Sequence, residues 1–234
     1  MFTFPFTIFS SSLFENLLST SFDGVDEFVQ TTVDLSGSTS FSISGWYFRA
    51  TATQRLDIDQ VDNANSNRIK LLINSGGGAV MVISGSSIFS PTLTTGWFHL
   101  VGVYDGSLAI NQRMKLYVDG VLQGTPSGTP PTSIPTIGDG QKLLIGKDNG
   151  PGAFSNGNID EVTVWGGALS DSDVLELYNS GDPNDPQAHS QSSILVNYWR
   201  MGDGDSATTI FDQVGSDNGT LVNMNSSNYV SDTP

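Results

Sequence analysis

The sequence predicts an all-β, turn-rich protein with one short helix. Two observations lead to this prediction. Apolar residues recur at every second position through most of residues 20–166, which is the pattern of strands with one buried face. Clusters of Gly, Pro, Asn and Asp separate these runs, and the 26 glycines of the 234-residue chain favour turns over helices.

The strands expected in this region span residues 21–30, 40–49, 55–60, 68–74, 79–84, 97–105, 113–119, 141–146 and 158–165. In the second of them, Phe41 and Ile43 share a face with Tyr47, while Trp46 lies on the opposite face. We expect the first face to be core and the second to be partly exposed to water. Four prolines predict that residues 124–140 form an irregular surface segment.

One segment, residues 171–179, has a helical pattern. Ser170 is a natural N-cap, and Asp171 and Asp173 lie in the first turn, where the helix dipole favours acidic side chains. Gly181 is placed to end the helix. We expect this helix to cap the sandwich.

Residues 181–234 differ from the rest of the chain in composition. A polar, proline-containing stretch is followed by strands expected at 194–200 and 219–224, and the tail 225–234 is expected to be weakly ordered unless another segment covers it. The predicted organisation is therefore an apolar arm (1–18), a sandwich (19–180), a polar connector (181–193) and C-terminal strands (194–234).

The composition excludes several classes of function. Nine Lys and Arg against 24 Asp and Glu give a net charge of −15, which repels polyphosphates and anionic lipids. Nucleic acids and membrane surfaces are therefore poor partners. The sequence has no cysteine, which excludes disulfides, thiol catalysis and zinc-thiolate sites. His99 and His189 are too few for a multi-histidine metal site.

The first 18 residues are rich in large apolar side chains and carry one charged residue, Glu15. No Lys or Arg precedes the apolar run, and Pro5 and several serines interrupt it, so we expect neither a signal peptide nor a membrane span. An exposed apolar set of this kind is typical of a binding surface, although residues 2–9 could instead add an edge strand to their own domain. The residues predicted to anchor the chain to a partner are Phe2, Phe4, Phe6, Phe9 and Phe14.

Six segments occur in an order and spacing that narrow the fold class further. They read SFDGVDEFV (21–29), FSISGWYF (41–48), WFHLVGVYDG (97–106), KLYVDGVLQGT (115–125), LLIGKD (143–148) and GNIDEVTVWGGALSDSDVLELY (157–178). Together they resemble the laminin-G-like branch of the concanavalin A-like jelly rolls. The resemblance covers residues 20–180 and implies a two-sheet antiparallel jelly-roll sandwich ended by a short helix.

The segment at 195–221 resembles the stretch that in this family usually precedes the SFDG-type strand, yet here it follows the closing helix. Two explanations remain open. In a permuted order the segment returns to its own sandwich, whereas in a swap it completes a neighbouring subunit.

No catalytic residue is predicted. The sequence has only four glutamates, and the Glu-x-Asp-x-(x)-Glu run of glucanases with this fold is absent. Asp57 and Asp59 share one strand face, with Asp62 beyond them, but no glutamate acid stands nearby and we interpret them as a solvated edge strand. No nucleophile elbow accompanies His99 or His189.

Calcium is the candidate cofactor, because loop aspartates beside glycines supply the oxygen ligands that it prefers. The family resemblance points to Asp23, Asp26 and Asp160 as ligands. The alternative is that these residues only fix turns. A second acidic stretch, from Asp203 onward, fails the EF-hand pattern at Ala207.

A carbohydrate site on this fold would use exposed aromatic rings that stack on sugars. Trp46, Tyr104 and Trp165 are the predicted ligand-binding rings, although strand alternation can bury them and we expect at least half of the candidate aromatic residues to be core.

The sequence favours a non-enzymatic virion surface protein, either a capsid decoration or a tail-fibre head, which is made in a host cytoplasm and released by lysis. The initiating Met1 and the missing export signal favour this interpretation, and the segment beginning YWRMGDGD at Tyr198 resembles structural proteins of marine bacteriophages. The expected partners are capsid or tail proteins, copies of the chain itself and host-surface glycans. The alternative is a cellular carbohydrate-binding or adhesion module, and an enzyme is the third choice.

Overall fold

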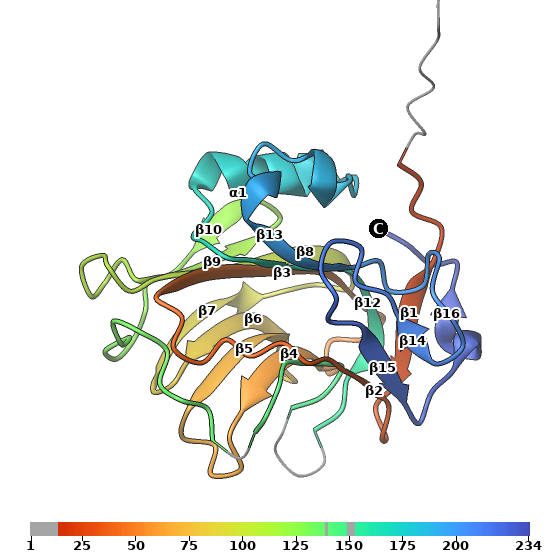
Figure 1. Cartoon of the computed structure of the whole chain (residues 1–234), viewed down its shortest axis with the longest axis horizontal. Helices are drawn as coiled ribbons and strands as arrows, with labels where there is room; N and C mark the ends of the chain where they lie inside the picture. The colour runs from red at the N-terminus through yellow and green to blue at the C-terminus, as the bar shows by residue number, and fades with distance from the viewer. Residues whose placement is uncertain (1–13, 139, 149–152) are drawn as a thin grey trace, which may run out of the picture.

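The structure, a computed structural model, describes residues 14–138, 140–148 and 153–234. It consists of two antiparallel sheets that face each other, which confirms the predicted all-β sandwich (Figure 1). The first sheet contains, in order, β10 (Val121–Gln123), β9 (Met114–Val118), β8 (Gly96–Asp105), β3 (Ser40–Arg49), β12 (Asn156–Trp165), β1 (Ser19–Asp23) and β16 (Tyr229–Val230), with β13 (Leu195–Trp199) also paired to β12. The second contains β14 (Thr209–Ile210), β15 (Gly219–Val222), β2 (Phe28–Gln30), β11 (Leu144–Ile145), β4 (Leu56–Val61), β5 (Arg68–Ile73), β6 (Gly78–Ile83) and β7 (Ser86–Thr92).

The main core lies between the two sheets and comes from alternate strand positions. Ile43 and Tyr47 of β3 and Leu56 and Ile58 of β4 belong to it, and all four are buried. Burying a side chain of this size stabilises the fold by about 1.5–3 kcal/mol. The strand alternation seen in the sequence therefore identifies the inner face of each sheet.

A helix, α1 (Asp171–Tyr178), covers the outer face of the first sheet (Figure 1). Its Leu177 belongs to a second apolar cluster together with Trp165 of β12. The helix begins with a capping box, because Ser170 Oγ accepts from the Asp173 backbone N–H at 3.2 Å and an Asp173 carboxylate oxygen accepts from the Ser170 N–H at 2.8 Å. Within the described parts of the chain, no helix is long and apolar enough to cross a bilayer.

The second face of β3 is not exposed to water, and that expectation is wrong. Ser42, Ser44 and Trp46 are all buried. Ser42 Oγ accepts from the Leu169 N–H at 3.0 Å, and the ring of Trp46 lies 6.0 Å from that of Tyr178. α1 and the chain around it therefore bury the outer face of the first sheet as well as its inner face.

The C-terminal segment adds strands to both sheets of its own chain. β13 pairs with β12, with Tyr198 opposite Thr163, while β15 pairs with β2 and β16 with β1. The tail contains η4 (Ser226–Asn228), and the side-chain amide of Asn228 donates to the Ser21 carbonyl at 3.0 Å. These contacts cover the tail, so it is part of the sandwich.

Several elements differ from the strands expected along the sequence. The single strand expected at 21–30 is two strands in opposite sheets, because Gly24 turns the chain with a φ of +81°. The alternation pattern does not predict β7, β14 or β16, each of which lies at the edge of a sheet. Edge strands are short or polar, so they carry little apolar periodicity.

Candidate binding site

The structure does not bring the three predicted calcium ligands together. Asp23 is exposed and pairs with Asn156, and its Oδ1 accepts from the Val25 N–H at 2.8 Å. Asp160 is buried four residues further along β12, roughly 13 Å away at about 3.3 Å per residue. Asp26 is exposed. The prediction of a shared ion is corrected, because Asp160 belongs to the interior and Asp23 fixes a turn.

The predicted sugar-stacking rings are buried. Trp46 is 4% exposed, and Tyr104 and Trp165 are 0% exposed. Tyr104 belongs to the main core, while Trp165 lies beneath the α1 layer and donates from Nε1 to Thr163 Oγ1 at 2.7 Å. None of the three offers an open ring face, so the structure corrects their assignment as stacking platforms.

Charged residues on the outer face of the second sheet form a buried group, here called the Asp57 cluster: Arg55, Asp57, Asp59, Lys70 and Asp148. Arg55 holds Asp57 with two hydrogen bonds of 2.6 and 2.7 Å and also reaches Asp148 Oδ2 at 2.6 Å. Lys70 Nζ lies 2.6 Å from the same Asp148 oxygen and 4.0 Å from Asp59 Oδ2.

Asp57 and Asp59 are therefore not on a solvated edge strand, and that interpretation is wrong. Both are 0% exposed, because β4 lies inside the second sheet between β11 and β5. Burial, followed by the charges of Asp57 and Asp148, holds the pKa of Asp59 well above its usual range. With Asp59 neutral, two carboxylates face two cations and the charges of the cluster balance.

The cluster has some of the features of a metal site. One oxygen each from Asp57, Asp59 and Asp148 lies within 4.8 Å of the others. However, Lys70 and Arg55 already occupy the position of a cation beside Asp148. A calcium ion would have to displace them, so the donor set does not fit calcium well.

We expect millimolar calcium to leave the melting temperature unchanged relative to a chelated sample of the same ionic strength. A ligand raises the melting temperature only if the folded state binds it selectively, and the charges of the Asp57 cluster are already balanced. Scanning calorimetry measures this directly. A calcium-dependent rise that Asp148→Asn abolishes would contradict the expectation and show that the ion displaces Lys70.

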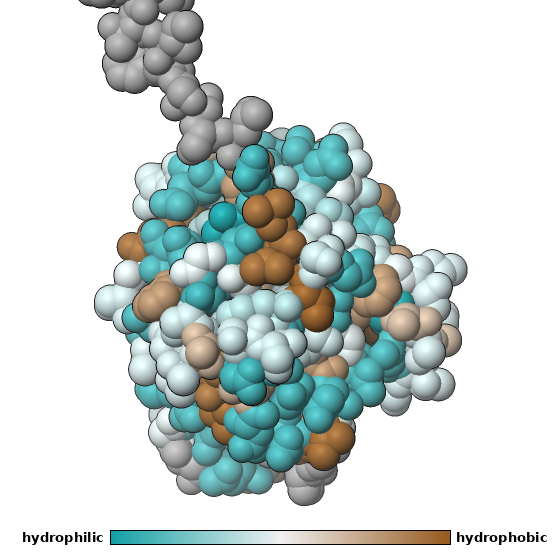
Figure 2. All heavy atoms as spheres, turned by 90° about the vertical axis from the view of Figure 1, so that its right-hand side faces the viewer, coloured by the Kyte–Doolittle hydropathy of each residue, from teal (hydrophilic) through white to brown (hydrophobic). Residues whose placement is uncertain are grey.

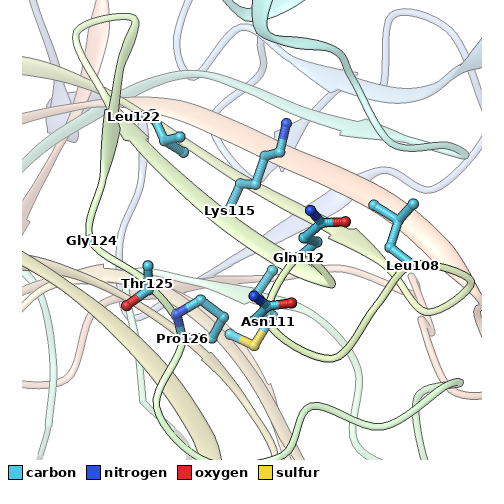
Figure 3. A pocket seen from close by; sticks show the side chains of 9 residues that line it. Leu108, Asn111, Gln112, Lys115, Leu122, Gly124, Thr125 and Pro126 are labelled. Carbon is cyan, nitrogen blue, oxygen red and sulfur yellow. The ribbon is translucent and has the colours of Figure 1, made fainter.

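A depression of about 340 Å³ lies beside β9 and β10 (Figure 3). The residues that line it are Leu108, Asn111, Gln112, Met114, Lys115, Leu122, Gly124, Thr125 and Pro126. Leu108 and Leu122 are 39% and 48% exposed and supply apolar surface. The Asn111 and Gln112 side chains make no hydrogen bond to another described residue, whereas Lys115 Nζ is paired with Asp171 at 2.6 Å. The polar groups of the depression that are free to bind a ligand, the amides of Asn111 and Gln112, are therefore uncharged.

A second depression, of about 300 Å³, is lined by Gln187, Ser192, Ser193, Leu195 and Val214. It lies on the connector that follows α1, on different elements from the first depression. Its exposed Gln187 provides a matched comparison for the amides of Asn111 and Gln112 in the first depression.

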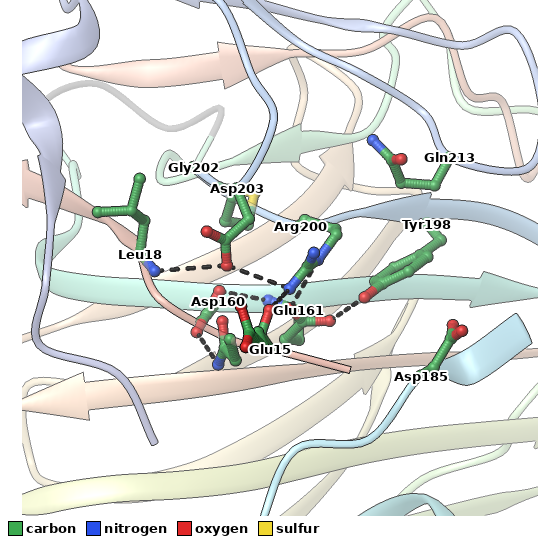
Figure 4. Close-up of polar contacts among 12 residues, drawn as sticks. Glu15, Leu18, Asp160, Glu161, Asp185, Tyr198, Arg200, Gly202, Asp203 and Gln213 are labelled. Carbon is green, nitrogen blue, oxygen red and sulfur yellow. Dashed lines mark hydrogen bonds and ion pairs between the residues drawn. The ribbon is translucent and has the colours of Figure 1, made fainter. Parts of the chain in front are cut away.

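A further buried network, here called the Glu161 network, consists of Asp160, Glu161, Tyr198, Arg200 and Asp203 (Figure 4). The Tyr198 hydroxyl donates to Glu161 Oε2, and Arg200 lies 3.4 Å from Glu161 Oε1 and 3.1 Å from Asp203 Oδ2. A register shift in β12 follows Asp160, and Glu161 has a φ of +48°. This bulge gives two adjacent carboxylates buried positions on one strand.

Burial raises the pKa of Glu161 to about 8, against the hydrogen bond from Tyr198 and the charge of Arg200, which lower it. Burial and the neighbouring Glu161 also hold the pKa of Asp160 well above its usual range. Both carboxyl groups therefore keep their protons to a higher pH than free carboxyl groups do. Two adjacent acids in the otherwise apolar run IDEVTVW are the sequence signal that could have identified this network.

The Glu161 network holds the start of the described chain. Asn16 Nδ2 donates to Asp160 Oδ2 at 2.8 Å, and the Leu17 N–H donates to Asp203 Oδ2 at 2.8 Å. Phe14 packs under the Arg200 guanidinium at 4.8 Å, a contact within its own chain. The other predicted anchoring residues, Phe2, Phe4, Phe6 and Phe9, lie outside the described residues. Figure 2 shows that this end of the molecule is mostly polar, with a narrow band of apolar residues below the start of the described chain.

Comparison with known proteins gives a family match and a set of similar folds. The family described as the concanavalin A-like lectin/glucanases superfamily matches residues 23–175. A search of the curated proteins by sequence finds no match.

Three solved structures illustrate the similarity of fold. A Bacteroides ovatus protein, provisionally named as carbohydrate binding, has a TM-score of 0.66 at 18% identity, over 89% of this chain and 58% of its own. The SAP-like pentraxin of Limulus polyphemus has a TM-score of 0.53 at 18% identity, over 70% of this chain and 82% of its own. The CBM40 of the Ruminococcus gnavus IT-sialidase, bound to α2,3-sialyllactose, has a TM-score of 0.53 at 15% identity, over 68% of this chain and 96% of its own. The chain thus spans less than two thirds of the B. ovatus structure.

Proposed function

Because the chain belongs to the concanavalin A-like lectin/glucanases superfamily, we propose that it is a non-enzymatic carbohydrate-binding module. The observation that carries the proposal is the depression beside β9 and β10, in which the free amides of Asn111 and Gln112 stand next to the apolar surface of Leu108 and Leu122. Amides both donate and accept hydrogen bonds, as sugar hydroxyls do, and apolar side chains suit the C–H face of a sugar ring.

The chemistry of the depression favours a neutral sugar. Lys115 is the one charged residue in its lining, and Asp171 neutralises it. The carboxylates that could serve catalysis are elsewhere: Asp57 and Asp59 are buried against Arg55 and Lys70, out of reach of a polysaccharide. The named sugar-binding neighbours support the proposal through their fold alone.

The site of action in a virion, with capsid or tail proteins as partners, stays a prediction from the sequence. A cellular adhesion module would use the same depression with the same chemistry, and the likeness to the B. ovatus and CBM40 structures favours this alternative. Proteomics of purified virus particles against the host cell fraction separates the two.

We expect the double variant Asn111→Ala/Gln112→Ala to lose about tenfold or more in affinity for its best glycan. Two hydrogen bonds of about 1 kcal/mol each would be removed, and about 1.4 kcal/mol is tenfold in affinity. A glycan array with the wild type identifies the glycan, and calorimetric titration measures the change. Both residues are exposed, so the melting temperature should stay as in the wild type.

The matched control is Gln187→Ala in the second depression, which should bind as the wild type does. Loss of binding in the control alone would move the site to the second depression and overturn the assignment. Release of reducing ends from the bound glycan, abolished by Asp59→Asn, would overturn the non-enzymatic proposal.

A further inference from the structure

Lys70 and Asp148 meet in a geometry that suits more than an ion pair. They lie 78 residues apart in sequence, on β5 and just after β11, and Lys70 Nζ is 2.6 Å from Asp148 Oδ2. Their side chains are only 8% and 11% exposed. A buried ion pair is costly to maintain, because both charges lose their hydration. A reaction that removes both charges would therefore be favoured at this position.

Asp59 is the third member of this arrangement. It is 0% exposed, and neither of its carboxylate oxygens receives a hydrogen bond within the described residues. Its Oδ2 lies 4.0 Å from Lys70 Nζ. Burial and the charges of Asp57 and Asp148 raise the pKa of Asp59 and so favour its protonated form, which can give a proton to the neighbouring Asp148 carboxylate. Asp59 thus lies beside the Lys70 ammonium and the Asp148 carboxylate, the two groups that would react.

We propose that Lys70 and Asp148 become joined by a covalent isopeptide bond, with Asp59 as the proton carrier. The bond forms between Lys70 Nζ and Asp148 Cγ, and one Cγ–O bond of Asp148 breaks. Arg55 Nη2 holds Asp148 Oδ2 at 2.6 Å, so this oxygen remains as the amide oxygen and the other leaves.

The atoms and protons of the step balance without a co-reactant. Asp59 gives its proton to the departing oxygen, and the ammonium of Lys70 supplies a second proton to complete one water molecule. A further ammonium proton returns to Asp59, and the last stays on the amide nitrogen. An ammonium and a carboxylate thus become an amide and water, and Asp59 is regenerated as the acid.

The bond would link β5 covalently to the segment after β11. In a chain without cysteine, it would do what a disulfide does elsewhere, because it closes a long loop in the unfolded state as well as in the folded one. It would also resist reduction.

The test is the intact mass of the folded full chain. We expect the wild type to be lighter than its sequence mass by one water, and proteolysis to yield a peptide that contains both Lys70 and Asp148. Lys70→Arg and Asp59→Asn should both have the full sequence mass, and Asp59→Asn removes the proton carrier while leaving the other contacts of the cluster in place. Lys142→Arg, which alters the exposed pair with Asp34, should stay one water lighter.

Two results would overturn the proposal. The first is a wild type at its full sequence mass after folding. The second is a water loss that persists in Lys70→Arg without a cross-linked peptide, because an aspartimide at an Asp-Gly pair such as Asp119-Gly120 gives the same mass. Circular dichroism of Asp59→Asn shows whether that variant is folded, which separates failed chemistry from failed folding.

Discussion

Raising the pH from 4.5 towards 8 is expected to destabilise the folded protein, because the pKa of Glu161 is raised from 4.5 to about 8 by burial. Within this window the folded state holds a proton that the unfolded chain releases, so stability is full below 4.5 and is lost as the pH rises through about 8. Each group that titrates in the window contributes about 1.4 kcal/mol of unfolding free energy per pH unit. The raised pKa values of Asp160 and Asp59 act in the same direction.

Asp34 makes stability depend on pH in the opposite direction, because its pKa is lowered in the folded protein. The Lys142 ion pair and other hydrogen bonds outweigh its burial and hold its pKa well below 3.8, so its contribution is lost as the pH falls below that value. The stability maximum is therefore expected at mildly acidic pH. Urea denaturation across a pH series measures the profile.

Glu161→Gln should flatten the decline, because it removes one titrating group. Glu176→Gln is the matched control: Glu176 lies on α1 with its pKa lowered by hydrogen bonds from Ser190, so its loss should leave the decline intact. A wild-type profile that rises between pH 4.5 and 8 would contradict the burial of a protonated Glu161.

Trp165→Ala is expected to lower the unfolding free energy by about 3–5 kcal/mol, the usual cost of deleting a buried aromatic ring. Trp165 is 0% exposed, packs with the α1 cluster and contacts the His189 ring edge-on at 5.0 Å. In a chain of this length, such a loss lowers the melting temperature by roughly 10 °C. Thermal and urea denaturation of the purified variant measure both quantities.

Trp97→Ala is the control for this variant. Trp97 is partly exposed, its ring meets that of Phe48 at a tilt, and its Nε1 donates to Asp232 Oδ1 at 3.4 Å. Trp97→Ala should lower the unfolding free energy by less than half as much as Trp165→Ala does. Glycan affinity of folded Trp165→Ala should equal that of the wild type. If Trp165→Ala kept the stability of the wild type but lost glycan binding, Trp165 would have to belong to the binding site after all.

Sequence alternation was sufficient to predict which face of β3 lies inward. It fails in β12, because the bulge at Glu161 reverses the alternation and both Ile159 and Val162 face the main core. It could not predict whether the opposite face is covered, since that depends on segments distant in the chain. Trp165 and Trp46 were assigned to a wet face that α1 in fact covers. The α1 capping box, by contrast, is local, and its residues predict it directly.

Contacts between segments distant in the chain also explain why the sequence did not predict the burial of the Asp57 cluster or the depression beside β9 and β10. Asp57 and Asp59 are surface residues by pattern. Their counter-charges are Arg55 and Lys70, and Asp148, brought beside them by β11, binds both of these cations. Asn111 and Gln112 lie in a loop whose sequence has no distinctive motif. Their importance arises from β10, which folds back beside them and supplies Leu122.

The pairing of β1 with β12 and β16 has a consequence for how the chain folds. β1 takes both of its partners from residues made much later in synthesis, and β2 likewise pairs only with the later strands β11 and β15. Contacts this distant in sequence make folding slow. During synthesis, β1 and β2 therefore remain open edges that can pair with another nascent chain, and release before the last strands emerge would favour aggregation over folding.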